Sequence, residues 1–177
     1  MQVSFAQSGM DTGKRVENRR PYTGYALNGI DGKGRVGIPA GLRATVEANG
    51  DGERMLFVAK HASDPCLVGY DRQRSNLIKA QLTADEQLDR GEGKAFDRLN
   101  RSRRAYATVD EVGFDGSGRF IIPGYLRQSA KLTDCALFFG VGDQFEIWSP
   151  AVLLETPQVD PELKELAQWL LDQRAVA

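Results

Sequence analysis

The sequence predicts an α+β fold, mainly β with α insertions, built from two copies of one small unit. The stretch from Ile30 to Pro39 recurs from Phe114 to Pro123, at an offset of 84 residues. Short apolar runs with strand propensity accompany each copy, and a polar segment with helical spacing separates the copies. Because a spaced set of Asp, Gly, Arg and Pro seldom recurs by chance, we expect a unit duplicated within the chain.

Composition is that of an ordinary globular protein. The chain has 177 residues, 41% of them hydrophobic and 27% charged, which indicates one domain of ordinary size or two very small ones. Each repeat has about 45 residues, near the size at which a unit rarely folds alone, so we expect a shared core. No apolar run could span a bilayer, and residues 1–26 show no signal-peptide pattern. We therefore expect a cytoplasmic protein with no membrane partner.

The repeated motif predicts a strand, a tight turn, a second strand and a helix. Eight of the 13 positions from 31 to 43 are identical in the second copy. Asp31 and Asp115 open the turns, where an aspartate side chain can accept backbone N–H groups. Gly34 and Gly118 permit positive φ angles. The proline that closes each motif suits the first turn of a helix.

Two arginines, Arg35 and Arg119, begin the second strand of each motif. A guanidinium is a rigid donor fork that can bond guanine O6 and N7 in the major groove, or a phosphate. A two-stranded ribbon fits into that groove. We therefore interpret Arg35 and Arg119 as direct readers of double-stranded DNA. Three nearby cations are weaker candidates, for phosphate contacts: Lys33, Arg43 and Arg127.

An internal ion pair between Asp31 and Arg35 is the structural alternative. An exposed pair stabilises a fold by only about 0–1 kcal/mol, so such a pair would contribute little by itself. The two roles can also be divided, with the aspartate holding the turn and the arginine reading DNA.

Residues 1–21 are polar and aperiodic, which predicts a disordered N-terminal arm. Its basic pairs, Lys14-Arg15 and Arg19-Arg20, suit either a solvated tail or a phosphate backbone. The first repeat, residues 22–70, then predicts a helix near residues 41–48 and a turn after it. The strands expected in this repeat cover residues 25–30, 55–59 and 66–70.

The middle segment, residues 71–106, predicts a helical connection. Leu77 and Leu82 mark one short helix, and residues 83–86 match a capping box for a second. The arginines toward the end of this segment suit a helix C-terminus as well as a nucleic acid. They are Arg98, Arg101, Arg103 and Arg104.

The second repeat, residues 107–150, predicts a strand pair at residues 136–141 and 144–148, joined by a tight turn. The last segment, residues 151–177, predicts an amphipathic helix from Pro161 to Ala175. Such a helix suits packing on its own domain or on a neighbouring subunit.

Charge is distributed unevenly along the chain. The net charge is −1, but residues 1–43 carry +4 and residues 149–177 carry −3. A protein that binds a polyanion needs a basic face and does not need a basic total. The distribution suits DNA binding and an ordinary solvated surface equally.

Motifs for catalysis, cofactors and metals are missing from the sequence. It holds no nucleophile elbow, Walker motif or His/Cys metal cluster. The glycines of residues 29–34 have the wrong spacing for a dinucleotide loop. We interpret Cys66 and Cys135 as small buried hydrophobic residues, and His61 as a lone loop histidine and not a metal ligand. We therefore expect no enzyme, no cofactor, no metal and no small-molecule substrate.

The doubled Asp-x-x-Gly-Arg-x-x-Ile-Pro motif, with residues 142–148 closing the second copy, resembles the MraZ family of bacterial transcription regulators. The resemblance covers about residues 22–150. It implies two SpoVT/AbrB-type halves that form a duplicated swapped-hairpin, double-psi-like β-barrel, and chains that assemble into rings. It also implies nucleoid association and binding to short direct repeats upstream of the division and cell-wall gene cluster. The family's Asp-x-x-x-Arg element maps onto Asp31 and Arg35, and onto Asp115 and Arg119.

Two departures from the family pattern leave alternatives open. The arm before Tyr22 is longer than usual, and Gly37 stands where the second copy has Ile121. Unequal contact of the two halves with DNA is therefore one alternative. A rival function is an AbrB-like barrel that acts as a protein-interaction or scaffold module without DNA readout. Salt distinguishes the two functions, because DNA binding weakens steeply as salt rises.

Overall fold

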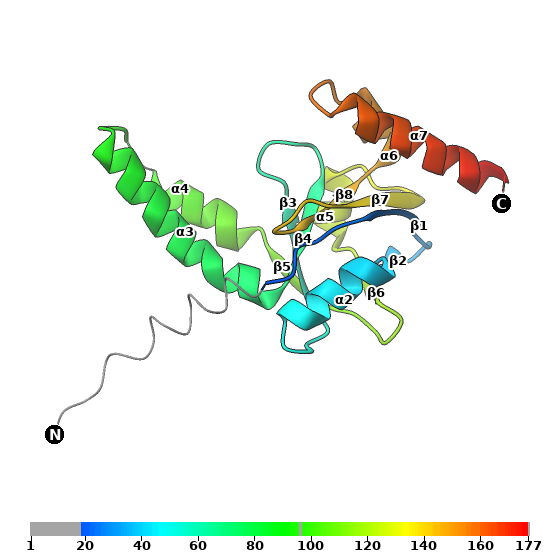
Figure 1. The fold of residues 1–177 in the computed structure, drawn as a ribbon, viewed down its shortest axis with the longest axis horizontal. Helices are drawn as coiled ribbons and strands as arrows, with labels where there is room; N and C mark the ends of the chain where they lie inside the picture. The colour runs from blue at the N-terminus through cyan, green and yellow to red at the C-terminus, as the bar shows by residue number, and fades with distance from the viewer. Residues whose placement is uncertain (1–18, 96, 177) are drawn as a thin grey trace.

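The computed structural model describes residues 19–95 and 97–176, and confirms a mainly antiparallel α+β fold (Figure 1). The first repeat holds β1 (Tyr25–Gly29), β2 (Arg35–Gly37), α2 (Ala40–Asn49), β3 (Met55–Lys60) and β4 (Leu67–Tyr70). The second repeat holds β5 (Asp110–Gly113), β6 (Arg119–Ile121), α5 (Gly124–Ser129), β7 (Cys135–Gly140) and β8 (Phe145–Trp148). The connection holds α3 (Arg72–Gly91), α4 (Arg98–Ser102) and a π-helical turn, η1 (Arg103–Ala107). Two helices, α6 (Pro150–Glu155) and α7 (Pro161–Val176), close the chain.

The two repeats exchange their first strands. The larger sheet has the order β1-β7-β8-β4-β3-β5, so β1 of the first repeat pairs with β7 of the second, and β5 of the second pairs with β3 of the first. The hairpins β3–β4 and β7–β8 meet where β4 pairs with β8. A second, two-stranded sheet pairs β2 with β6. Each repeat therefore completes its sheet only with strands of the other.

One core joins both repeats, as expected from their size. The inner face of the six-stranded sheet packs against the two-stranded sheet and the helices α2 and α5. Val36 and Phe120, opposite each other on β2 and β6, are 1% and 2% exposed. Burying apolar side chains from both copies in one core stabilises them together. Cys66 and Cys135 are buried with free thiols, and burial raises the pKa of both.

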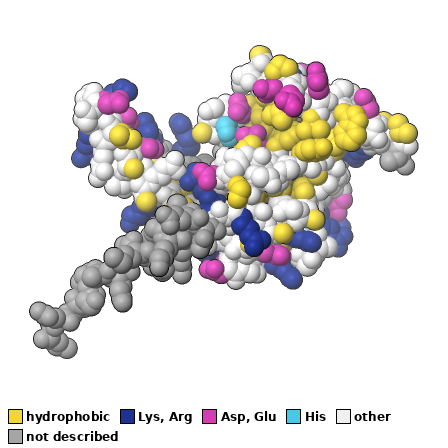
Figure 2. Space-filling model, viewed as in Figure 1, with side chains coloured by type: hydrophobic (Ala, Val, Ile, Leu, Met, Phe, Trp, Pro, Cys, Tyr) yellow, Lys and Arg dark blue, Asp and Glu magenta, His cyan; other side chains and the backbone are white. Residues whose placement is uncertain are grey.

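Helices cover the outer face of the sheet in two separate patches. The helices α6 and α7 pack on Leu137, Phe139 and Trp148, and in Figure 2 the largest apolar group on this face lies around α7. The start of α3 covers the other half, where Phe57 stacks on Tyr70 at 5.7 Å. The rest of α3 leaves the sheet and α4 returns beside it, a helical projection clear in Figure 1.

The helical connection differs from its prediction. One helix, α3, replaces the two short helices expected. Asp71 caps its start by accepting the N–H of Arg74 at 2.8 Å. Thr83 does not cap a second helix; its Oγ1 donates to the carbonyl of Lys79 within α3. The helix ends at Gly91, two residues before Gly93, which has a φ of +69°. Arg98 bonds Glu86, so this arginine ties α4 to α3.

A buried polar cluster holds the start of the described chain. Asp71, 0% exposed, accepts hydrogen bonds from Arg19 Nη2 at 2.8 Å, Tyr22 Oη at 2.7 Å and Asn49 Nδ2 at 3.1 Å. Burial acts to raise the pKa of Asp71, but the hydrogen bonds, from Arg19 above all, outweigh it and lower the pKa. Arg19, expected in the N-terminal arm, is thus buried, with a side chain 7% exposed.

Arg20, also expected in the arm, donates its backbone N–H to Asn49 Oδ1 at 2.9 Å. Residues 1–18 of that prediction lie outside the described residues. None of the helices described is both long and apolar enough to cross a membrane.

Candidate nucleic-acid interface

The strands β2 and β6 form a short ribbon with a tight turn before each strand. Turn 1 is Asp31–Gly34 and turn 2 is Asp115–Gly118. Because the strands are antiparallel, the two turns lie at opposite ends of the ribbon. Two further backbone bonds extend the pairing: Ile38 N donates to Gly118 O at 2.8 Å, and Ile122 N donates to Gly34 O at 3.0 Å. The backbone just after each strand is therefore hydrogen-bonded to the last residue of the other repeat's turn.

The outer face of the ribbon holds four residues: Arg35, Gly37, Arg119 and Ile121. Successive side chains of a strand point to opposite sides, so these four face away from the core that Val36 and Phe120 enter. The side chains of Arg35 and Arg119 are 48% and 61% exposed. They occupy diagonal corners, and diagonal residues of an antiparallel pair lie about 7–8 Å apart. The structure thus brings both expected reader arginines onto one exposed face.

The aspartate of each turn organises the backbone around it. Asp31 Oδ1 accepts the N–H groups of Lys33 and Arg35, both at 2.9 Å. Asp115 Oδ1 accepts the equivalent N–H groups of Ser117 and Arg119, also at 2.9 Å. The last residue of each turn is a glycine with positive φ, +79° at Gly34 and +82° at Gly118. The two turns therefore share one backbone geometry.

Each aspartate also orients its arginine. Arg35 Nε lies 2.6 Å from Asp31 Oδ2, and Arg119 Nε lies 3.2 Å from Asp115 Oδ2. The internal ion pair considered above is thus present in both turns. Among the described residues, however, Nη1 and Nη2 of both arginines donate to no acceptor. The geometry suits a division of roles, in which Asp fixes the fork and the two Nη groups face solvent.

Both aspartates are ionised at neutral pH. The backbone N–H and then the guanidinium of Arg35 lower the pKa of Asp31 to about 2, from a usual 3.8. The Ser117 hydroxyl, followed by the backbone N–H of Arg119, lowers the pKa of Asp115 further. At every pH at which duplex DNA is stable, each guanidinium is therefore paired with a negatively charged carboxylate.

Arg43 and Arg127 support the turn of the opposite repeat. Arg43 Nη1 donates to the carbonyl of Gly116 in turn 2 at 3.3 Å. Arg127 lies against Gly34 of turn 1 and bonds the carbonyl of Thr133 through Nη2 at 2.9 Å. Both guanidiniums thus donate hydrogen bonds within the chain, and the phosphate contacts expected of them stay a prediction. The Lys33 side chain stays exposed at the tip of turn 1.

Arg54 is a cation near the ribbon that sequence reasoning missed. Its carbonyl accepts Phe114 N at 3.1 Å, as the carbonyl of Asp134 accepts Ile30 N at 2.8 Å in the other half. Arg54 and Asp134 are therefore equivalent in space, although they lie outside the repeated motif. The Arg54 guanidinium lies beside Gly116 of turn 2. The residue that binds the backbone just before turn 2 is therefore a cation, and the equivalent residue just before turn 1 is an anion.

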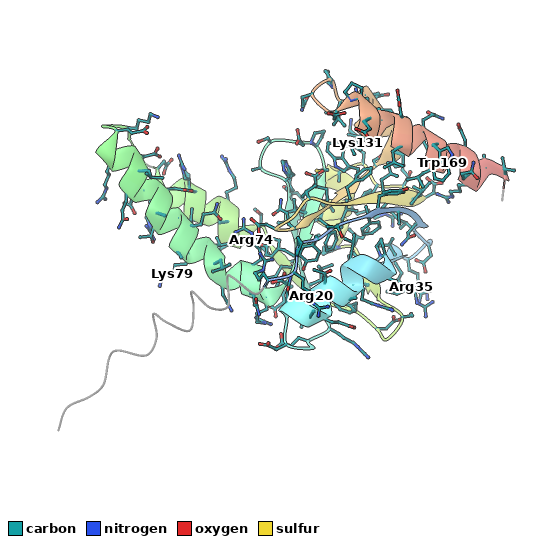
Figure 3. All side chains as sticks on the ribbon, in the orientation of Figure 1. Arg20, Arg35, Arg74, Lys79, Lys131 and Trp169 are labelled. Carbon is teal, nitrogen blue, oxygen red and sulfur yellow. The ribbon has the colours of Figure 1, made fainter. Side chains whose placement is uncertain are left out.

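Basic side chains mark this part of the surface. Lys and Arg, with some Asp and Glu between them, lie along the lower edge of the molecule in Figure 2, where Figure 1 places α2 and the ribbon. Arg35 lies on the side of the molecule opposite the helical projection (Figure 3). The projection leaves that side of the ribbon uncovered.

The sequence of this chain is similar to one family of known proteins. Residues 105–152 match a family model described as MraZ protein, antitoxin-like. A Transcriptional regulator MraZ of Lactiplantibacillus plantarum is 37% identical over 127 residues, which cover 72% of this chain and 81% of that protein. The chain belongs to the MraZ family. MraZ regulators of Gluconacetobacter diazotrophicus and Pseudomonas fluorescens are 32% and 33% identical, each with 79% of its length covered.

The MraZ likeness extends beyond the second repeat. The family model covers turn 2 and the strands β6, β7 and β8. The alignments with MraZ relatives span 127 or more residues, far more than one repeat holds. The first repeat or the connection therefore contributes to the likeness as well.

Proposed function

We propose that this MraZ-family chain is a sequence-specific DNA-binding transcription regulator that reads short direct repeats in its own promoter region. The promoter expected from the family resemblance lies upstream of the division and cell-wall gene cluster, and the protein acts at the nucleoid in the cytoplasm. One observation carries the proposal: Arg35 and Arg119 share one exposed ribbon face, each held at Nε by an aspartate with both Nη groups outward.

This arrangement matches what guanine recognition requires. Guanine offers O6 and N7 side by side at its major-groove edge, and the two Nη groups of one arginine can bond both. An arginine already oriented by a carboxylate loses less side-chain freedom on binding, which favours affinity. The diagonal separation of about 7–8 Å is about the rise of two base-pair steps along one strand. Both arginines can therefore contact bases in the same major groove.

The exchange of β1 and β5 supports a swapped-hairpin barrel of the AbrB type for the whole unit. Surface features of the helical projection support assembly into a ring-like homo-oligomer. Leu88 and Leu99 are 66% and 61% exposed in the single chain, and no residue of α3 is buried. A ring would present several ribbons to several repeats of one duplex, and linked weak contacts gain affinity by avidity.

The test is binding of the full chain to the duplex upstream of its own coding region, at near-physiological salt. Arg35→Ala and Arg119→Ala are each expected to weaken binding by about 1–3 kcal/mol, with unchanged circular dichroism. Arg90→Ala is the matched control, because Arg90 lies on the helical projection with a side chain 74% exposed. Normal binding by both folded ribbon variants would contradict the proposed reading.

The alternative function is a protein-interaction or scaffold module without DNA readout. It becomes the leading function if the wild-type chain, folded and assembled, fails to retain the duplex at physiological salt. A salt series separates the two functions, because counterion release makes DNA affinity fall steeply as salt rises.

A further inference from the structure

The two arginines of the ribbon have different neighbours across the strand pair. Ile121 of β6 lies opposite Arg35 of β2, whereas Gly37 lies opposite Arg119. Opposite residues of an antiparallel pair have β-carbons about 4.5–5.5 Å apart. One arginine therefore stands beside a branched apolar side chain and the other beside bare backbone.

The exposure of Ile121 is not explained by packing. The residue is 58% exposed, while Phe120 before it and Ile122 after it are each 2% exposed. A single exposed apolar residue needs no explanation on its own. Ile121, however, is the apolar member of the four-residue face that holds both proposed readers. Any molecule that docks on this face therefore meets the Ile121 side chain.

The absence of a side chain at Gly37 is not required by the fold. Its φ lies outside the left-handed region, and a β-carbon there would meet one atom within 4 Å, Asn28 Nδ2 at 4.0 Å. An alanine would thus fit at Gly37 without strain. The difference between Gly37 and Ile121 changes the outer surface and leaves the core as it is.

We infer that Ile121 is a specificity-determining residue that contacts the C5 methyl group of a thymine next to the guanine read by Arg35. This inference rests on the proposed function. Thymine is the base that displays a methyl group in the major groove, and apolar side chains recognise it there. The methyl stands out from the base edge, within reach of a short side chain beside a longer arginine. Arg119, beside Gly37, reads its guanine with no such requirement.

The experiment compares two forms of one duplex, the region upstream of the chain's own coding sequence. One form contains thymine, and the other contains deoxyuridine in place of every thymine, which removes the methyl groups and keeps base pairing. Wild-type chain is expected to bind the uracil form roughly fourfold more weakly for each methyl contacted. Ile121→Ala is expected to bind both forms equally, at about the wild-type affinity for the uracil form. Val141→Ala, which truncates an exposed apolar residue in the β7–β8 turn, is expected to discriminate as the wild type does.

Three outcomes overturn the inference. A wild-type chain that binds both forms equally reads no methyl group. An Ile121→Ala variant that still discriminates shows that another side chain reads it. A variant weakened to the same extent on both forms shows that Ile121 acts only through the shape of the ribbon. If the wild type binds neither form, the proposed DNA-binding function itself fails, a result distinct from these three.

Discussion

Arg43 of the first repeat lies against Gly118 of the second: a β-carbon added to Gly118 would stand 2.7 Å from Arg43 Cδ. Gly118 also has a φ of +82°, which costs an L-residue roughly 1–2 kcal/mol. Gly118→Ala is therefore expected to lower the free energy of unfolding by about 1–2 kcal/mol or more, measured by denaturant titration.

Gly116→Ala in the same turn is the control for that substitution. Gly116 has no positive φ, and a β-carbon there would meet Arg54 Nη1 at an ordinary 3.5 Å. We expect a change within about 0.5 kcal/mol. Equal losses for the two variants would contradict the role assigned to the contact between Arg43 and Gly118.

Asp71 is expected to be among the costliest side chains to remove. Asp71→Ala leaves the Arg19 side chain, 7% exposed, without its buried partner and paired with the exposed Asp143 at 3.3 Å. Loss of one member of a buried pair costs about 3–5 kcal/mol, a change visible in thermal or denaturant unfolding. Arg90→Ala, at an exposed pair with Glu86, should change stability by less than about 1 kcal/mol. A similar small loss for Asp71→Ala would show that the buried pair contributes no more than a surface pair.

The carboxylate of Asp31 links stability to pH in acid. Its pKa in the folded chain is about 2, below the usual 3.8, so its contribution is complete above pH 3.8 and is lost as the pH falls toward 2. Asp31→Asn should therefore be less stable than wild type at about pH 5, with the difference closing between about pH 4 and pH 2. Unfolding curves across that range measure it. A stability difference that stays constant down to pH 2 would show that the ionised carboxylate is not responsible.

Lys33 offers a test of phosphate contact without base reading. Its side chain is exposed at the tip of turn 1, and a lysine that meets a phosphate adds counterion release. Lys33→Ala should reduce the slope of log affinity against log salt by about 1 and weaken all sequences alike. Lys79→Ala on α3, away from the ribbon, should leave the slope unchanged. A loss confined to one DNA sequence would assign Lys33 to base reading instead.

Leu88 and Leu99 test the proposed assembly. Both are exposed on the helical projection, and a charge introduced at an apolar interface is costly to bury. Leu88→Glu and Leu99→Glu should keep the circular dichroism of the wild type and lower its mass in sedimentation. Lys79→Glu is the control on the same helix. An unchanged mass for both leucine variants would place the subunit interface elsewhere.

The local features of this fold could be predicted from sequence because neighbouring residues encode them. The aspartate, glycines and proline of each motif specify a turn followed by a helix, and α2 and α5 begin directly after Pro39 and Pro123. The single long α3 was missed because residues 83–86 resemble a capping box. In the structure Thr83 lies inside the helix, and Asp71 caps its start. The helix α6 was not expected either, although Pro150 at its first turn was a signal for it.

The pairing of strands that are far apart in the chain could not be predicted from the residues of the motif. Nothing in the motif states that β1 pairs with β7, or that Arg35 lies opposite Ile121, because register depends on strands more than 80 residues apart. The Arg19–Asp71 pair likewise joins two segments that each read as polar surface. The site arginines were predictable as residue types in a repeated pattern. Their common face, and the bonds that hold their Nε atoms, required the structure.

The difference between the two strands of the ribbon has a consequence for the proposed DNA binding. A reader made of two identical chains has a two-fold axis, and its preferred site is a palindrome that mirrors the axis. Here the two halves belong to one chain, so β2 and β6 carry different residues at equivalent positions, as Gly37 and Ile121 do. The two ends of the ribbon are therefore not equivalent. Under the proposed function, such a ribbon would distinguish the two directions of a duplex, and a head-to-tail set of ribbons would match sites that all point the same way.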